Sequence, residues 1–487
     1  MDRPNILLIT TDQHRGDCLG ISGNPVVCTP NLDALGRSGR YFAHAFSPMP
    51  VCVPARYGIM TGRLPYSWGM RGNNGVIPEG VPTLPSLLSS HGYRTALIGK
   101  AHFRGPEAEC ERLGIPSWRY SYGFDEMVIS EEGRQWASGG DDYQAYLRRV
   151  GWSGYERAHG IGNNDPRSGA SALPEEHYHT TWCARESIAW MQRHRVDRPD
   201  QPFFLWCSFV KPHAPYDPPE PWDRMYSPRD VPAPIGDVGD LHGLSPYYLK
   251  CHYERHVDAM SPEAIRRSRA FYYGLIAQID HEVGRLIGAL EQMGIRRDTV
   301  VLFCSDHGDL LGDHGMFFKS NFFRGSWHIP MLLSCPGRIE PAPVSERLVT
   351  LTDVMPTLLE LAGVEPPTGV HGVSLLDENE NRHHIFGSLQ PHRSAIHAVR
   401  TREWQYVFHA NGGQQELYDL RRDWDERENL AYNDGCQDVC RELRAALTTH
   451  LREMDPTLLG SDGDVASTEP DWPTFGPVPT RLGLRPY

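Results

Sequence analysis

The sequence predicts an α/β protein in which helices cover both faces of a sheet, followed by a smaller C-terminal domain. Three observations lead to this prediction. Short apolar runs alternate with helical patterns along most of the chain, several of these runs end in acidic or basic side chains, and the pattern changes near residue 376. A chain of 487 residues has room for one large domain and one small one.

Four apolar runs have the length and composition of buried strands: NILLITTDQ, RTALIGKAHF, PFFLWCSFVKPHAPY and DTVVLFCSDHGD. The polar residues at their ends are, in chain order, Asp12, Lys100 and His102, Lys211 and His213, and Asp306 and His307. Ligands of open α/β sheets bind at the carboxyl ends of the strands. We therefore expect the four ends to form a single site.

Helical patterns lie between these runs. The clearest covers 263–293, where one face is apolar through Tyr272, Ile276, Ile279, Val283, Leu286 and Leu290. TLPSLLSSHG predicts a shorter helix that stops at a glycine. The regions 104–182 and 211–262 are rich in Gly, Pro and Trp, and we expect them to form long loops over the sheet, where substrate-selecting segments usually lie.

The change near residue 376 divides a predicted catalytic domain, 1–375, from a C-terminal subdomain, 376–487. The subdomain contains the strand-like pieces HAVRTREWQYVFH and QELYDL and a helical pattern around 434–453, which predict a small antiparallel sheet and one helix. The Pro/Gly-rich tail, 455–487, is expected to extend over the surface. In LYDLRRDWDERENL, Asp423 and Glu426 are interpreted as ordinary turn and capping residues.

Composition limits the classes of function. A net charge of -13 argues against a nucleic-acid-binding protein, so any anion site has to be built locally. Eleven cysteines, an odd number without a repeating frame, fit a reducing compartment. The N-terminal apolar run is interpreted as a strand rather than a signal peptide, and no run approaches the ~18 apolar residues of a membrane helix. We expect a cytoplasmic protein without a membrane partner.

Only four of the 48 basic residues are lysines: Lys100, Lys211, Lys250 and Lys319. A lysine retained in such an arginine-rich chain can serve as a compact or titratable donor, which arginine cannot. Codon bias is the alternative explanation. Lys100 and His102 alternate at a strand end, so both side chains are expected on the same side.

The segment SPMPVCVPARYGIMTGRLP places Cys52 just before a predicted helix. Pro54 suits the first turn of that helix, and a helix N-terminus stabilises an anionic group. Arg56, one turn later, would point back to the same place, and a thiolate would benefit from this field. The alternative is a structural cysteine packed as a small apolar residue.

Asp12, Asp306 and His307 form a candidate metal site. Carboxylates suit Ca²⁺, Mg²⁺ or Mn²⁺, and the imidazole favours a transition metal slightly. For the pentad SDHGD taken alone, a turn with a capping aspartate is the simpler interpretation.

CVPAR followed by YGIMTGRLP resembles the signature of the type I sulfatases of the alkaline-phosphatase superfamily. The order and spacing of further motifs agree with that family from about residue 4 to about residue 430, including PNILLITTDQHRGDCLG, GYRTALIGKAHF, KPHAPY and SDHGDLLGDHGMFFK. The resemblance implies an alkaline-phosphatase-like large mixed sheet sandwiched by helices. It also implies that a formylglycine-generating enzyme converts Cys52 to formylglycine, with Pro54 and Arg56 marking the site.

The resemblance implies one divalent cation, calcium first with manganese or magnesium as alternatives. Asp12, Asp306, His307 and the hydrate at Cys52 would hold it. Gln13 stands where many sulfatases have a second Asp, and is a weaker candidate ligand.

The resemblance also assigns roles to the remaining candidates. Lys100 and Lys319 would hold sulfate oxygens, and His213 with Lys319 would protonate the leaving alkoxide. His102 would assist the aldehyde hydrate. Asn73, in MRGNNG, would contact substrate.

The predicted function is hydrolysis of a small sulfate ester of a sugar, aryl or choline type. One alternative is a phosphonate monoester or phosphodiester hydrolase on the same scaffold, in which Gln13 is typical but the pair Lys100 and His102 is not. The other is a metal-binding module without turnover, in which Cys52 stays a thiol. A homo-oligomer joined through the tail is left open.

Overall fold

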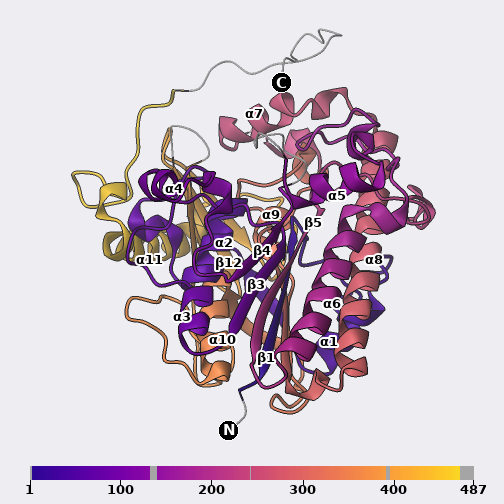
Figure 1. Ribbon diagram of the computed structural model, residues 1–487. Helices are drawn as coiled ribbons and strands as arrows, with labels where there is room; N and C mark the ends of the chain where they lie inside the picture. Colours follow the sequence, from indigo (N-terminus) through magenta and orange to yellow (C-terminus); the bar gives the residue numbers. More distant parts are fainter. Residues whose placement is uncertain (1–2, 132–139, 242, 391–394, 472–487) are drawn as a thin grey trace.

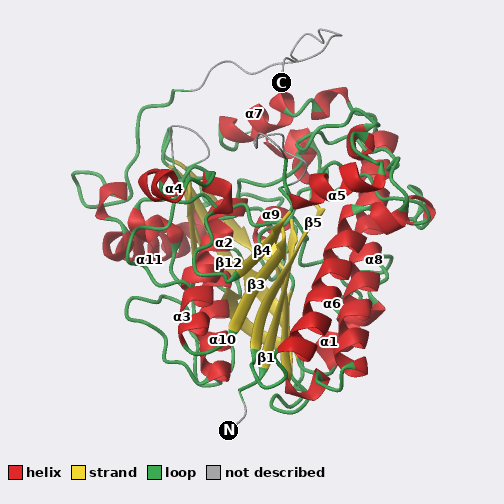
Figure 2. Cartoon of the chain, in the orientation of Figure 1, coloured by secondary structure: helices red, strands yellow, loops and turns green. Residues whose placement is uncertain are grey.

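The computed structural model describes residues 3–131, 140–241, 243–390 and 395–471. This part of the chain forms a nine-stranded mixed sheet between two layers of helices, with a separate four-stranded sheet beside it (Figures 1 and 2). The predicted fold class is therefore confirmed.

The strands of the large sheet are β1 (Asn5–Asp12), β2 (Arg40–Phe46), β3 (Arg94–Gly99), β4 (Glu126–Ile129), β5 (Phe203–Pro212), β6 (Thr299–Ser305), β7 (His328–Ile329), β8 (Met331–Ser334) and β9 (Ser345–Thr350). The helices of this part are α1 (Pro30–Arg37), α2 (Cys52–Thr61), α3 (Leu84–Ser90), α4 (Glu107–Leu113), α5 (Asp142–Val150), α6 (His179–Asp197), α7 (Pro246–Glu254), α8 (Pro262–Gln292), α9 (Arg324–Trp327) and α10 (Val354–Ala362).

The four strands predicted from the sequence are neighbours within the sheet. In the order β4-β3-β5-β1-β6-β8-β2-β7, the run β3-β5-β1-β6 is parallel, whereas β8 pairs antiparallel with β6, and β9 pairs with β2. Parallel strands end at the same edge of a sheet, and that edge is where ligands of α/β proteins bind. Asp12, Lys100, His213 and Asp306 therefore leave the sheet along one edge, as the sequence predicts.

Side chains of the central strands alternate between two apolar cores. In β1, Leu7 and Ile9 pack in the core that includes α1, α6 and α8, whereas Ile6 and Leu8 pack in the core that includes α2, α3 and α10. This alternation is the period of two of a strand. Because both faces are covered, the strands are continuous apolar runs. Full burial of each such side chain contributes about 1.5–3 kcal/mol.

The two predicted helices are confirmed. α8 differs from the predicted 263–293 by one residue at each end, and all six predicted apolar side chains are buried. Ser261 caps α8 by accepting a hydrogen bond from the backbone N–H of Ala264, and Pro262 occupies its first turn. α3 begins with a capping box between Thr83 and Ser86.

The region 104–182 differs from the long loop that its composition predicts. It contains α4, α5 and β4, and β4 pairs in parallel with β3 at the edge of the sheet. A strand of four residues is too short to show a clear period of two, so only its pairing with β3 defines it.

The C-terminal subdomain contains the small sheet, made of β10 (Ile385–Leu389), β11 (Ile396–Arg400), β12 (Trp404–His409) and β13 (Gln414–Asp419), antiparallel in chain order. α11 (Gln437–Met454) packs against one face of this sheet, close to the predicted 434–453. The other face packs against Phe322 and Trp327 of the catalytic part. Within the tail, Thr468 pairs with Asn411, and residues 472–487 lie outside the described residues.

Glu426 lies in the predicted turn, where its backbone N–H donates to the oxygen of Asp423, but it does more than an ordinary turn residue. Its buried carboxylate accepts hydrogen bonds from Arg400 Nη1 at 3.0 Å and from the backbone N–H of Arg324 at 2.6 Å. Glu426 thus joins the small sheet to the catalytic part, and neither partner is its neighbour in sequence. Asp423 does act as a turn residue, since its side chain accepts the backbone N–H of Arg427 at 2.7 Å.

Two findings concern membrane-spanning helices and disulfide bonds. None of the helices in the described ranges has the length and apolar character needed to cross a bilayer. The described ranges contain no disulfide bond between any of the eleven cysteines, and the sulfur atoms of Cys183 and Cys207 lie 3.8 Å apart in the core.

Buried histidines make the stability depend on pH. Burial lowers the pKa of His179, His328 and His397 from 6.5 to about 3. The folded protein keeps these rings neutral, whereas the unfolded chain protonates them below about pH 6.5. We therefore expect the free energy of unfolding to fall as the pH drops from about 6.5 towards 3, by about 1.4 kcal/mol per pH unit for each ring. Thermal melts between about pH 7.5 and about pH 5 measure this dependence. His397→Gln should make the melting temperature fall less steeply with falling pH. A melting temperature that does not change with pH would contradict the prediction.

Candidate active site

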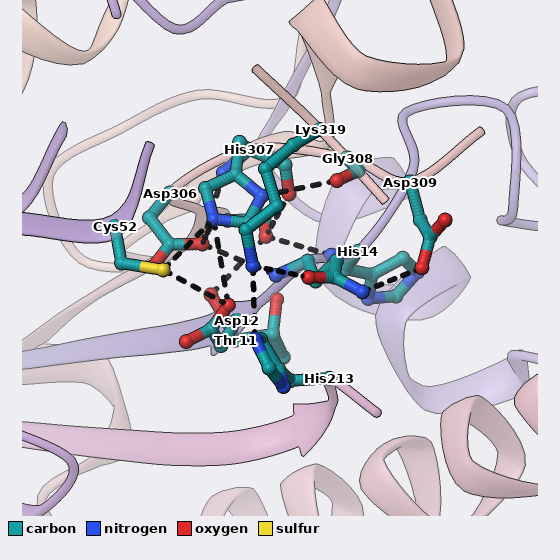
Figure 3. Close-up of polar contacts among 12 residues, drawn as sticks. Thr11, Asp12, His14, Cys52, His213, Asp306, His307, Gly308, Asp309 and Lys319 are labelled. Atoms are coloured by element: carbon teal, nitrogen blue, oxygen red, sulfur yellow. Dashed lines mark hydrogen bonds and ion pairs between the residues drawn. The ribbon is translucent and has the colours of Figure 1, made fainter. Parts of the chain in front are cut away.

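Four side chains from three segments meet at the carboxyl edge of the large sheet (Figure 3). Cys52 Sγ lies 3.2 Å from His307 Nε2 and 3.9 Å from Asp12 Oδ1. His307 Nε2 is 3.6 Å from Asp12 Oδ1 and 3.7 Å from Asp306 Oδ1. One ligand atom from each of the four residues lies within 4.8 Å of the others, and all four residues are buried. The candidate metal residues are thus brought together around Cys52.

The donor set fits one divalent cation. Metal–ligand distances of about 2.0–2.6 Å allow a single ion to contact atoms as far apart as those of this cluster. Two carboxylates and an imidazole accept Ca²⁺, Mg²⁺ and Mn²⁺.

Cys52 opens α2, as the sequence predicts, and Arg56 follows one turn later. Arg56 is completely buried and its Nε donates to Asp306 Oδ2 at 3.0 Å. Its Nη1 donates to the backbone oxygen of Lys100 and to Ser208 Oγ, both at 2.9 Å. The guanidinium therefore holds Asp306 in the cluster and links the residues that follow β3 and β6 to the middle of β5.

Positive side chains control the ionisation of the cluster. Lys100 Nζ forms an ion pair with Asp12 Oδ2, which leaves Oδ1 directed towards His307 and Cys52. Burial is the largest influence on the pKa of the Cys52 thiol and raises it, as does Asp12. The positive charges of Lys319, Lys100 and His307 outweigh both and bring this pKa to about 7. Burial also raises the pKa of Asp12, but the charges of Lys100 and its neighbours hold it well below its usual range.

Lys319 and His213 form a second part of the site. Lys319 Nζ lies 2.9 Å from His213 Nε2 and donates to Gln13 Oε1 at 2.6 Å. His213 Nδ1 lies 2.7 Å from the backbone oxygen of Ala214, so Nδ1 carries the ring proton and Nε2 is an acceptor. Burial, followed by the charge of Lys319, lowers the pKa of His213 well below its usual range, so the ring is neutral.

Lys211 supports the segment that carries His213. Its buried Nζ donates to the backbone oxygens of His213 at 3.2 Å and Pro215 at 2.7 Å, and to Asp217 Oδ1 at 2.6 Å. Asp217 in turn accepts a hydrogen bond from Tyr178 at 2.9 Å. Three of the four lysines thus lie at or directly behind the site, whereas Lys250 pairs with a glutamate of its own helix.

The prediction that Lys100 and His102 lie on the same side of an extended strand end is wrong, because the strand stops before them. β3 ends at Gly99, whose φ is +106°, and His102 has a φ of +53°, so the segment is not extended. His102 is buried and donates its backbone N–H to Glu131 at 2.5 Å. In the part of the chain that the structure describes, the ring of His102 does not belong to the cluster of Asp12, Cys52, Asp306 and His307.

Asn73 and Gln13 lie beside the cluster. Asn73 accepts a hydrogen bond from the backbone N–H of Val53, next to Cys52, at 3.1 Å. The Gln13 side-chain oxygen accepts a hydrogen bond from Lys319 Nζ at 2.6 Å.

Asp309 is a residue of this site that the sequence analysis did not identify. It is completely buried, and its carboxylate accepts hydrogen bonds from Gln13 Nε2 and Tyr216 Oη, both at 2.5 Å. A signal was present, because Asp309 is the last residue of the SDHGD pentad.

Comparisons with known proteins show to which family the chain belongs. The Sulfatase family model matches residues 4–364, and a model of the C-terminal region of N-sulphoglucosamine sulphohydrolase matches residues 312–453. An arylsulfatase of Clostridium perfringens is 32% identical over 462 residues, covering 92% of this chain and 94% of that protein. A choline-sulfatase of Rhizobium meliloti is 31% identical over 469 residues, covering 91% of this chain and 86% of that protein.

A solved structure is similar over the whole chain. The phosphonate monoester hydrolase of Agrobacterium radiobacter superposes with a TM-score of 0.82 at 26% identity, covering 96% of this chain and all of that one. The family model covers more than half of the chain, and both relatives are more than 30% identical over most of its length. This chain therefore belongs to the sulfatase family of the alkaline-phosphatase superfamily, and it is a sulfatase.

Proposed function

We propose that this sulfatase hydrolyses a sulfate monoester to an alcohol and inorganic sulfate, with Cys52 converted to formylglycine and one divalent cation bound beside it. The observation that carries the proposal is the gathering of four ligand atoms within 4.8 Å of one another, one of them the Cys52 sulfur. The charges of two lysines act on this cluster, which suits an anionic ester.

A cation bound by these groups would lower the pKa of a coordinated hydroxyl and so supply a nucleophile near neutral pH. Lys100 and Lys319 place positive charge where the oxygens of a sulfate group would lie next to Cys52. Arg56 keeps Asp306 in place, so the cluster is preorganised before substrate binds.

The proton for the leaving oxygen is best carried by Lys319. His213 Nε2 is an acceptor in the neutral ring and faces Lys319 Nζ at 2.9 Å, so the ammonium group is the proton-bearing partner of the pair. A general acid has to lie within hydrogen-bonding reach of the leaving group. Lys211 fixes the backbone of His213 and so keeps this pair aligned.

Hydrolysis of a phosphonate monoester or phosphodiester is the second candidate function. Gln13 in place of a second aspartate and the likeness to a phosphonate monoester hydrolase favour it. Lys100 beside Asp12 and the arylsulfatase and choline-sulfatase relatives favour a sulfate ester.

Rates on matched aryl substrates distinguish the two candidates. We expect protein produced together with a formylglycine-generating enzyme to hydrolyse 4-nitrophenyl sulfate with a kcat/KM at least about 10-fold higher than that for 4-nitrophenyl phenylphosphonate. The leaving group is 4-nitrophenolate in both substrates, so the difference reports the transferred group. A higher kcat/KM on the phosphonate would favour the second candidate.

Mass spectrometry of the peptide that contains Cys52 tests the third alternative, a metal-binding module. Converted Cys52 together with turnover supports an enzyme with formylglycine. Protein from its native host that binds metal with an unmodified thiol and shows no turnover would support the binding module.

We further propose small sulfated substrates of the aryl, choline or sugar type. The relatives named arylsulfatase and choline-sulfatase support the first two. Turnover of a panel of aryl sulfates, choline sulfate and sulfated sugars would rank these classes.

We also propose a reducing compartment such as the cytoplasm. The eleven cysteines, none in a disulfide within the described ranges, support it.

A further inference from the structure

Asp309 connects three segments that carry active-site groups. Its Oδ1 accepts the backbone N–H groups of Leu311 at 2.9 Å and Phe318, the neighbour of Lys319, at 2.7 Å. Its Oδ2 accepts hydrogen bonds from Gln13 and Tyr216, both at 2.5 Å, and Tyr216 follows the His213 segment. In Figure 3, Asp309 lies on the Lys319 side of the cluster, away from Cys52.

The chemistry of these contacts leaves one orientation for the Gln13 amide. A carboxylate only accepts hydrogen bonds, so Gln13 has to present its NH₂ group to Asp309. Its carbonyl oxygen then faces Lys319, whose ammonium only donates. The contacts of the Gln13 backbone with Asp306 and Tyr272, at 3.1 and 2.6 Å, fix the base of the side chain.

We propose that Asp309 is a positioning residue that orients the Gln13 amide and, through it, holds the Lys319 ammonium group towards His213. Gln13 Oε1 and His213 Nε2 are then the two acceptors between which Lys319 is aligned. The inference rests on the proposed sulfate-ester hydrolysis, because it gives the protons of Lys319 a catalytic use.

Asp309→Asn reverses the polarity of this chain of hydrogen bonds. The amide oxygen of the new side chain stays with the two backbone N–H groups, so its NH₂ group faces Gln13. Gln13 then has to rotate its amide, which turns its own NH₂ group towards Lys319. Gln13→Glu in the Asp309→Asn background places one carboxylate oxygen opposite the new NH₂ group at position 309 and the other opposite Lys319, so both donors have an acceptor. Gln13→Glu alone places its carboxylate against that of Asp309.

A double-mutant cycle on 4-nitrophenyl sulfate measures this. We expect each single variant to lose about 10- to 100-fold in kcat and the double variant to be at least about 10-fold more active than Asp309→Asn. A double variant whose loss equals or exceeds the product of the two single losses overturns the inference. If Asp309→Asn alone does not fold, the double variant is still expected to fold and turn over, and its failure to do so also overturns the inference.

Two further measurements separate positioning from a general structural effect. In a Lys319→Met background, Asp309→Asn is expected to change kcat by less than about 2-fold, since the group that it positions is gone; an undiminished loss would contradict the inference. Asp280→Asn is the matched control, because Asp280 is also buried and accepts one side-chain amide and two backbone N–H groups, between α8 and α1. Its kcat is expected to stay near the wild-type value.

The melting temperatures of the wild type, the two single variants and the double variant test the inference without turnover. We expect the double variant to melt at a higher temperature than Asp309→Asn. If the two single changes in melting temperature simply add in the double variant, this inference is contradicted and the proposed function is not. A wild-type enzyme that is inactive on every sulfate ester would contradict the proposed function alone.

Discussion

Cys52→Ala is expected to lower kcat/KM for an aryl sulfate by about 10⁴-fold or more, because the proposed function makes this side chain, as formylglycine, the nucleophile. Cys52 is the residue at which the cluster, the start of α2 and the sulfatase signature coincide. Alanine is smaller than cysteine, so the variant should fold and keep its metal ligands from the other three residues. Turnover, and the mass of the Cys52 peptide in the parent protein, are the measurements.

Cys440→Ala is the matched control for this prediction. Cys440 is also a buried thiol, but it packs in the core between α11 and the small sheet. Its kcat/KM should match the wild-type value. Substantial activity in Cys52→Ala would rule out a covalent role for position 52.

Asp306→Ala is expected to abolish binding of the proposed cation and to remove much of the stability. Asp306 contributes one ligand atom to the cluster and is the counter-ion of the completely buried Arg56. Loss of a bound cation removes several kcal/mol of transition-state stabilisation, so kcat/KM should fall by about 10³-fold. Leaving Arg56 buried without its partner should lower the free energy of unfolding by about 3–5 kcal/mol.

Metal content by mass spectrometry and thermal melts separate the two effects. Chelation of the wild-type protein should reproduce the loss of activity, and added Ca²⁺ or Mn²⁺ should restore it. Asp353→Ala is the control, because it breaks another ion pair with a buried carboxylate, to Arg382, in another part of the molecule. That variant should melt earlier and keep its metal; an Asp306→Ala protein with full metal content would contradict the assignment.

The strand ends were predictable because the signals that define them are local. Continuous apolar runs reflect strands covered on both faces, and the residues after them, such as Asp12 and Asp306, follow from the direction of a parallel sheet. The same reasoning was wrong at His102, because the chain leaves the extended conformation at Gly99. Backbone turns with positive φ change where a side chain points, and alternation no longer applies.

The sequence by itself determined the α/β class, the four central strands, the long helix α8 and the residues that surround Cys52. The helices and strands depend on neighbours along the chain, through periodicity and capping. The residues around Cys52, as far as 255 positions away, follow from motif spacing and from strands that end at one edge of the sheet. Only the tertiary structure decided the partners of Asp309, Lys211 and Glu426. Asp309 and Gln13, for example, are 296 residues apart in sequence. Hydrogen bonds across such distances depend on the order of strands and the paths of loops, which no local pattern encodes.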